Sequence, residues 1–255
     1  MVQKNIIITP KFLTLVFFIL LSIHCDATTS EIWQPIAAGI EYQKLESNSF
    51  IPWSGIHVLR VDLKKNNLSL KTAKSIHLPK AFAKEYAEKS HALIAINGGF
   101  FDDNHQPLGL RIDHQQQLSP LKRISWWGVF YLRHKKAYIQ SLSSFHLKKD
   151  IDLAIQSGPR LLVDHQIPRH LKPGHAERSA IGITADGRLI LLVTEHSLIT
   201  TTELAGIMQR PPLNCVYALN LDGGRSSQLS IHSPHFSLEV PGISQVSDAL
   251  VINPI

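Results

Sequence analysis

Apolar and polar residues alternate along several short stretches of the chain, which is the pattern of half-buried β-strands. Gly55–Leu63 and Leu68–Thr72 both alternate, and the polar segment Lys64–Asn67 between them predicts that they form a hairpin. A second hairpin is predicted over Ala180–Thr194, because Asp186-Gly187 in its middle favours a tight turn. Further apolar stretches predict strands at Ala92–Ile96, Trp126–Leu132, Ala137–Gln140, Leu153–Gln156 and Val216–Leu221.

Two segments predict helices. Pro79–Lys89 is rich in good helix formers, and Thr200–Glu203 is a capping box that opens a helix to about Gln209. The predicted strands outnumber these helices and often follow one another directly. We therefore expect an α+β fold in a single domain over residues 28–255, with layers of mostly antiparallel or mixed β-sheet and a few flanking helices.

The N-terminus has the layout of a secretory signal peptide over residues 1–27. Lysines and no acidic residue precede the apolar stretch Phe12–Ile23, and small residues up to Ala27 offer a cleavage site. A secreted or periplasmic location follows, with no transmembrane anchor after the signal is removed. Lipid attachment at Cys25 is the weaker alternative, because the bulky His24 precedes it.

Composition narrows the function classes. The chain has 255 residues, of which 44% are hydrophobic and 18% charged, an ordinary globular balance with a net charge of +6. The positive charge favours anionic ligands, but no basic run with interleaved aromatic residues indicates nucleic acid as a partner. Cys215 lies in an apolar stretch, where a buried and unreactive thiol is expected.

Known catalytic and metal-binding patterns are missing from the sequence. The chain has 14 histidines, but they form no HExxH or Cys/His ligand pattern, so we expect no metal site and no cofactor. The GxSxG nucleophile elbow of many serine hydrolases is also absent.

Two glycine pairs follow predicted apolar strands. Asn97 precedes Gly98-Gly99, and Asp222 precedes Gly223-Gly224. Glycine pairs let the backbone turn sharply and approach a ligand closely, which would place both polar side chains at a binding site. The alternative is a pair of ordinary glycine turns capped by those side chains.

Two arginines stand beside small residues near predicted strand ends. Arg160 belongs to Ser157-Gly158-Pro159-Arg160, and Arg178 directly precedes the strand from Ala180. A guanidinium fork suits phosphate or carboxylate oxygens. The alternative for either arginine is a surface salt bridge.

These motifs occur in an order that resembles the phosphodiester glycosidase family. The segments that carry the resemblance are NGGFFD at Asn97–Asp102, SGPRLL at Ser157–Leu162, RSAIGIT at Arg178–Thr184 and NLDGGRSSQL at Asn220–Leu229. The resemblance spans roughly residues 55–251, and it implies a hydrolase of sugar-1-phosphodiesters in a glycan, envelope polymer or glycolipid. This sequence departs from the family at Glu177, where proline is frequent, and at Arg225, where a small residue or proline is usual.

The reaction implied by the resemblance assigns the roles of the candidate residues. A cation must hold the departing phosphate, which we assign to Arg178, and a carboxylate must activate water or attack carbon, which we assign to Asp222. Glu195 and Asp102 are further candidate catalytic carboxylates. The candidate substrate-binding residues are Asn97, Gly98, Gly99, Arg160, Gly223, Gly224, Ser226 and Ser227.

Two other functions stay open from the sequence. A non-catalytic protein that binds glycans or phosphates in the cell envelope is one, because Glu177 and Arg225 place charge beside the expected site. A metal-dependent phosphodiesterase that cuts the P–O bond is the other, because phosphoester cleavage commonly recruits cations. The predicted partner is a carbohydrate phosphodiester, and no oligomeric state is assigned.

Overall fold

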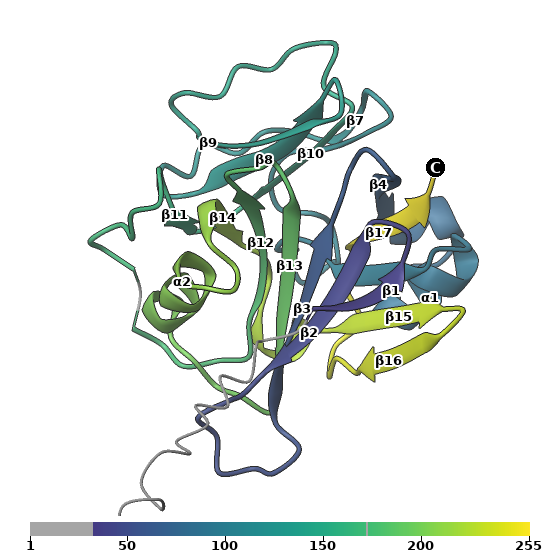
Figure 1. Cartoon of the computed structure of the whole chain (residues 1–255). Helices are drawn as coiled ribbons and strands as arrows, with labels where there is room; N and C mark the ends of the chain where they lie inside the picture. Colours follow the sequence, from purple (N-terminus) through teal and green to yellow (C-terminus); the bar gives the residue numbers. More distant parts are fainter. Residues whose placement is uncertain (1–32, 172) are drawn as a thin grey trace, which may run out of the picture. The chain divides into compact units, whose positions relative to one another are not determined.

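The strands of this protein pair into three antiparallel sheets. A computed structural model describes residues 33–171 and 173–255, and residues 33–255 form one compact unit. The predicted signal peptide at 1–27 lies outside the described residues. In the described part of the chain, two α-helices lie against the sheets (Figure 1).

Sheet A is the largest sheet and runs through the middle of Figure 1. Its strands, in spatial order, are β1 (Gln34–Ala37), β2 (Ile40–Leu45), β3 (Gly55–Val61), β13 (Leu189–Glu195), β12 (Ser179–Thr184), β14 (Cys215–Asn220) and β11 (Arg160–Leu162). The hairpin predicted over 180–194 is confirmed as β12 and β13, with Ile183 opposite Leu189. Gly187 in its turn has a φ of 81°, which glycine adopts without strain.

Two further sheets pack against sheet A. Sheet B consists of β16 (Phe236–Val240), β15 (Leu229–Ser233), β5 (Ile94–Asn97), β17 (Asp248–Pro254) and β4 (Asn66–Thr72). Sheet C consists of β7 (Gln116–Ser119), β6 (Arg111–Asp113), β10 (Leu153–Ser157), β8 (Gly128–Arg133) and β9 (Lys136–Ser141). One apolar core joins the three sheets, as shown by Leu59 and Leu191 of sheet A, Ile96 of sheet B and Phe130 of sheet C.

The prediction of a hairpin over residues 55–72 is wrong. β3 pairs with β2 and β13 in sheet A, whereas β4 pairs with β17 in sheet B. The segment between them carries the chain from one sheet to the other, and the Asn66 amide anchors it by donating to the carbonyls of Ala38 (2.9 Å) and Asp62 (3.2 Å). Local alternation predicts that a segment is a strand, but it does not determine which strand it pairs with.

The helices are short and flank the sheets. α2 (Thr201–Gln209) begins at the predicted capping box: Glu203 N donates to Thr200 Oγ1 (3.1 Å), and Thr200 N donates to Glu203 Oε2 (2.7 Å). α1 (Ala83–Lys89) is shorter than predicted, because Ala81 forms a β-bridge with Val246 instead. Two 3₁₀ turns complete the elements, η1 (Ala73–Ile76) and η2 (Gly224–Ser226).

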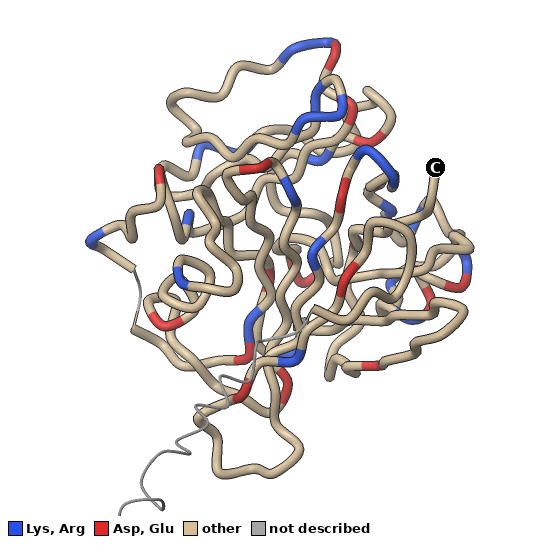
Figure 2. The backbone as a smooth tube through the Cα atoms, viewed as in Figure 1, with Lys and Arg blue, Asp and Glu red and all other residues tan. Residues whose placement is uncertain are grey.

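The observed fold agrees with the predicted class in its antiparallel sheets, while helices contribute only α1 and α2 within the described residues. Cys215 is fully buried, and burial raises the pKa of its thiol to about 12, as expected for an unreactive cysteine. Across residues 33–255, apart from 172, no helix is long and apolar enough to cross a bilayer. Figure 2 shows basic and acidic residues interspersed along the backbone, so the net positive charge is not confined to one part of the fold.

Candidate active site

The two predicted glycine loops lie side by side. Asn97 ends β5, and its Nδ2 donates to the carbonyl of Asp222 (2.8 Å), while Asp222 N donates to the carbonyl of Gly98 (3.1 Å). Asn97 Oδ1 accepts from Ser179 Oγ (2.7 Å) and from Gln228 N (3.2 Å). Substrate binding was predicted for Asn97, whereas its side chain is fully buried and its amide group holds the two loops together.

The backbone amides of the paired glycines also have partners within the protein. Gly98 N donates to the carbonyl of Asp248 (2.9 Å), and Gly99 N donates to Asp248 Oδ1 (3.1 Å). Gly223 N donates to Asp222 Oδ1 (2.9 Å), and the fourth amide, of Gly224, donates to the carbonyl of Glu177 (2.7 Å). These glycines therefore allow the loops to pack closely, and their amide groups are not available to bind a ligand in this structure.

A buried ion pair that the sequence analysis missed supports the first loop. Arg111 Nε lies 3.0 Å from Asp248 Oδ2, and both side chains have an exposed fraction of 0%. Arg111 also donates to the carbonyl of Phe100 (3.1 Å). A Cβ on Gly98 would lie 1.8 Å from Asp248 Oδ1, so only glycine fits at that position. Asp248 is the one charged residue of β17, which was the available sign of such a pair.

Asp222 has the environment of a titrating carboxyl group. Burial raises its pKa from 3.8 to about 6, opposed by hydrogen bonds from Ser226 and Gly223 N and by the charge of Arg111, and reinforced by Asp248. The 3₁₀ turn η2 brings Ser226 back towards the carboxyl group. Asp222 therefore changes charge near pH 6, within the range useful for acid–base chemistry.

Arg178 lies beside the second glycine loop. The position of a Cβ on Gly223 is 3.9 Å from Arg178 Cδ, so the arginine stem passes next to the residue that follows Asp222. The guanidinium donates to the carbonyls of Ile199 (Nε, 2.9 Å) and Gly174, and burial lowers its pKa. Within the described residues, no ion pair joins Arg178 to Asp222 or to any other carboxylate.

Glu195 ends β13 at the same edge of sheet A. β12 pairs with both β13 and β14, with Ser179 opposite Val193 and Ala180 opposite Asn220, so Arg178, Glu195 and Asp222 all lie at this edge. The carboxylate of Glu195 has a buried partner, because His57 Nε2 lies 3.0 Å from Glu195 Oε2. His57 Nδ1 lies 2.9 Å from Tyr42 Oη, which completes a chain of three polar groups.

This chain of Tyr42, His57 and Glu195 is mostly shielded from solvent. Burial lowers the pKa of His57, although the bond to Glu195 opposes that change, and burial raises the pKa of Tyr42 to about 12. The side chain of Glu195 keeps an exposed fraction of 21%. Glu195 is therefore the end of the chain that solvent reaches.

The structure places two predicted residues elsewhere. Asp102 Oδ1 accepts from Asn104 N (3.0 Å) and Gln106 N (2.9 Å), so this carboxylate caps its own turn. Arg160 lines a separate pocket beside β9. The local sequence could not show where these two side chains point, because the surrounding turn or strand determines the direction of each.

Among the described residues, three of the eight buried side-chain polar atoms without a partner belong to the predicted motifs. Asn220 Nδ2 donates to the carbonyl of Gly158 (3.1 Å), which joins the SGPR segment to the second glycine loop. Ser157 Oγ, Asn220 Oδ1 and Ser227 Oγ are buried and have no hydrogen-bond partner among the described residues. Unpaired buried polar atoms are costly, and a polar ligand is one partner that would satisfy them.

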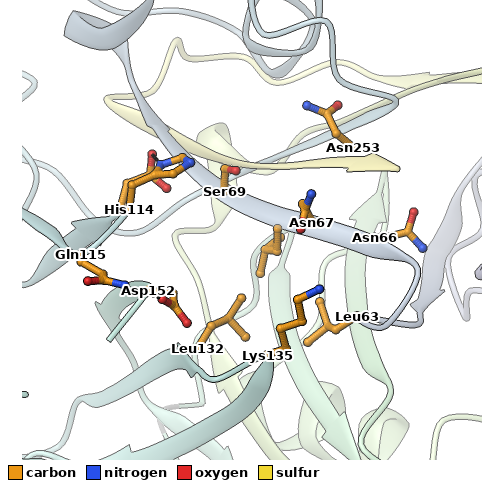
Figure 3. Close-up of a pocket in the computed structure, with 12 residues that line it drawn as sticks. Leu63, Asn66, Asn67, Ser69, His114, Gln115, Leu132, Lys135, Asp152 and Asn253 are labelled. Carbon is orange, nitrogen blue, oxygen red and sulfur yellow. Dashed lines mark hydrogen bonds and ion pairs between the residues drawn. The ribbon is translucent and has the colours of Figure 1, made fainter. Parts of the chain in front are cut away.

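A polar pocket of about 530 Å³ lies at the start of β4, and none of the predicted site residues lines it (Figure 3). Its acidic groups are occupied: Asp113 Oδ1 accepts from Leu70 N (3.0 Å), and Asp152 Oδ1 accepts from Gln115 Nε2 (3.1 Å). We therefore place the candidate active site at the glycine loops. In the parts of the chain that the structure describes, no three His, Cys, Asp or Glu side chains gather as a metal ligand set.

The four predicted motifs all lie within the part of the chain that matches a known family. A family model described as phosphodiester glycosidase matches residues 90–253. An uncharacterized protein of Escherichia coli K12, YigE, is 32% identical over 141 residues, a match that spans 51% of this chain and 55% of that protein.

Solved structures show the same fold. The zebrafish N-acetylglucosamine-1-phosphodiester alpha-N-acetylglucosaminidase catalytic domain, auto-inhibited by its pro-peptide, has a TM-score of 0.65 at 17% identity, over 87% of this chain and 85% of that one. A hypothetical protein from Synechocystis has a TM-score of 0.60 at 17% identity, over 84% and 62%. A putative exported protein from Burkholderia pseudomallei has a TM-score of 0.55 at 12% identity, over 79% and 74%.

Proposed function

Because the chain belongs to the phosphodiester glycosidase family, we propose that it hydrolyses the bond between an anomeric carbon and a phosphate oxygen in a sugar-1-phosphodiester. The observation that supports this most directly is that Asp222, whose pKa is about 6, is followed by a glycine that lies next to the stem of Arg178, whose guanidinium has no carboxylate partner among the described residues. An acid–base group and a cation for the departing phosphate are the two requirements of this reaction.

The proposed reaction adds the hydroxyl group of a water molecule to the sugar. In one route, ionised Asp222 takes a proton from the water while the water oxygen bonds to the anomeric carbon. In the other route, Asp222 attacks the anomeric carbon itself, and water then releases the sugar from Asp222. The bond from the anomeric carbon to the phosphate oxygen breaks, and its electron pair leaves with a phosphate monoester. Arg178 stabilises that anion through its guanidinium.

The second carboxylate and the unpaired polar atoms have supporting roles in this proposal. Glu195 lies at the same sheet edge with a partly exposed carboxylate, so it is the second acid–base group. Asn220 Oδ1 accepts from a substrate hydroxyl, and Ser157 Oγ and Ser227 Oγ bind substrate hydroxyl or phosphate oxygens, since none of these atoms has a partner in the described protein.

The direct test is hydrolysis of benzyl diesters of several sugar-1-phosphates by the full chain, measured as released reducing sugar. We expect Asp222→Asn and Arg178→Gln each to lower kcat/KM at least a hundredfold, because each removes charge stabilisation at the reacting atoms. Asp103→Asn and Arg123→Gln are matched controls at exposed positions and should keep full activity. No turnover of any diester by the unmodified chain would refute the proposal.

Reaction in ¹⁸O-labelled water identifies the bond that breaks. A released phosphate monoester without label indicates cleavage at the anomeric carbon, as proposed. Label in the phosphate, together with loss of activity in a chelator, would indicate the metal-dependent phosphodiesterase instead. Tight binding of the diesters without any product would indicate the binding protein.

We also propose that the protein is exported and acts on envelope polymers or glycolipids. The proposal rests on the apolar stretch Phe12–Ile23 and its flanking residues, which lie outside the described residues. Fusion of residues 1–40 to alkaline phosphatase tests it, because that reporter is active only after export.

A further inference from the structure

Arg160 is unusual among the arginines that are not exposed. Four of the others form ion pairs with carboxylates: Arg60, Arg111, Arg133 and Arg188. Among the described residues, the guanidinium of Arg160 has no hydrogen bond or ion pair, and burial alone lowers its pKa. A partly desolvated cation without a counter-charge is unfavourable, so an anion at this position would be stabilising.

The side chain of Arg160 lines a pocket of about 550 Å³ between β9 of sheet C and the strands β12 and β14 of sheet A. This volume is in the usual range of small-molecule sites. Tyr138 and Tyr217 contribute aromatic rings, and Tyr138, with an exposed fraction of 37%, is stacked on Tyr131 at a centroid distance of 5.0 Å. The other polar side chains of the lining are Gln140, Ser141, Ser144 and Thr184.

The chemistry of this lining suits a sugar that carries an anionic group. Arg160 is the only charged residue among the described residues that line the pocket, although Asp164 accepts a hydrogen bond from Tyr217 and Asp186 accepts one from Thr184. A guanidinium fork matches the paired oxygens of a carboxylate or phosphate. Tyrosine rings offer apolar faces with a polar edge, and hydroxyl and amide groups can bond to sugar hydroxyls.

The pocket is separate from the candidate active site but shares a strand with it. Arg160 lies opposite Leu219 in the pairing of β11 with β14. The lining residues Val216 and Tyr217 lie towards the start of β14, whereas Asp222 follows its end. At about 3.3 Å per residue in a strand, Tyr217 and Asp222 are roughly 17 Å apart. This separation is within the length of a short extended polymer.

We propose that the Arg160 pocket binds a sugar unit bearing a carboxylate or phosphate, in a polymer whose glycosyl–phosphate bond lies at Asp222. The substrate class would then be an acidic polymer. This statement about the substrate rests on the proposed hydrolase function, whereas the binding of an acidic sugar by the pocket does not.

Binding to the full chain is measured by titration calorimetry with trigalacturonate, glucose 6-phosphate, maltotriose and inorganic phosphate. We expect one or both of the acidic sugars to bind at least tenfold more tightly than maltotriose. Arg160→Gln should remove that preference, and Arg160→Lys, which keeps the charge without the fork, should keep part of it. Arg123→Gln is the matched control, since it removes an exposed arginine outside the pocket, and it should leave binding unchanged.

Three results would overturn the pocket assignment. One is equal affinity for maltotriose and both acidic sugars, and another is an equal effect of Arg160→Gln and Arg123→Gln. The third is inorganic phosphate binding as tightly as the acidic sugars with no effect of Tyr138→Ala, which would mean an anion site without sugar recognition. Circular dichroism confirms that each variant is folded.

Hydrolysis separates this proposal from the proposed function. Hydrolysis of the benzyl diesters by the unmodified chain tests the proposed function, and the acidic-sugar preference of the same protein tests the pocket. Acidic-sugar binding that depends on Arg160 in a protein without hydrolase activity would refute the function and keep the pocket. Normal hydrolysis without any acidic-sugar preference would refute the pocket and keep the function.

Discussion

Replacing Asp222 with asparagine should make the protein more stable and less active at neutral pH. Burial holds the pKa of Asp222 at about 6, above its ordinary value of 3.8, so the folded state penalises the ionised carboxylate. Asparagine keeps an oxygen that accepts from Gly223 N but carries no charge. The substitution therefore removes an unfavourable charge from a site where, in our proposal, that charge performs the reaction.

The magnitude follows from the two pKa values. The difference between 3.8 and about 6 corresponds to roughly 3 kcal/mol at about 1.4 kcal/mol per pKa unit. The folded pKa is the higher one, so this stability is fully present below about pH 3.8 and is lost as the pH rises through about 6. Between about pH 4.5 and about pH 8 the unmodified chain should lose about 2 kcal/mol through this group, and Asp222→Asn should not.

The assay is urea denaturation of both proteins at several pH values. The free energy of unfolding of Asp222→Asn minus that of the unmodified chain should increase by about 2 kcal/mol from about pH 4.5 to about pH 8. The difference isolates Asp222, because all other groups titrate in both proteins. Asp103→Asn, at an exposed position, is the matched control for the loss of a carboxylate. A pH-independent difference for Asp222→Asn would refute the reasoning, as would one that decreases with pH.

Two other predictions concern buried groups. Arg111→Met leaves the fully buried Asp248 without its partner and should cost about 3–5 kcal/mol in the free energy of unfolding. Arg133→Met, at a more exposed pair, should cost much less, and equal costs in urea denaturation would contradict the structural role of Arg111. Cys215, with a pKa of about 12, should react with Ellman's reagent at neutral pH only after denaturation, and rapid reaction of the native protein would contradict its burial.

The sequence alone was sufficient for features that depend on neighbouring residues. The Asp186-Gly187 turn, the capping box at Thr200 and the buried strand that contains Cys215 all agree with the structure. Each is determined by local backbone preference or by the alternation of apolar residues, which a single segment displays. The order of the four motifs likewise indicated the family that the match at residues 90–253 shows.

The prediction of strands was incomplete where a segment contains polar residues or proline as well as apolar residues. β17 (Asp248–Pro254) is flanked by β5 and β4 in sheet B, but it was not predicted. It begins with a buried aspartate and ends at a proline, both of which are uncommon inside strands. Asp248 is tolerated there because Arg111 arrives from sheet C to pair with it.

Only the tertiary structure decided which groups meet. It places β3 and β4 in different sheets and directs Arg160 into a separate pocket. It also brings Asn97 into hydrogen-bond contact with the backbone of Asp222, although the two residues are far apart in the sequence. Alternation determines which side of a strand is apolar, and it is a local property. Strand partners and side-chain directions at strand ends instead depend on how the apolar surfaces of all three sheets are buried together, which no single segment contains.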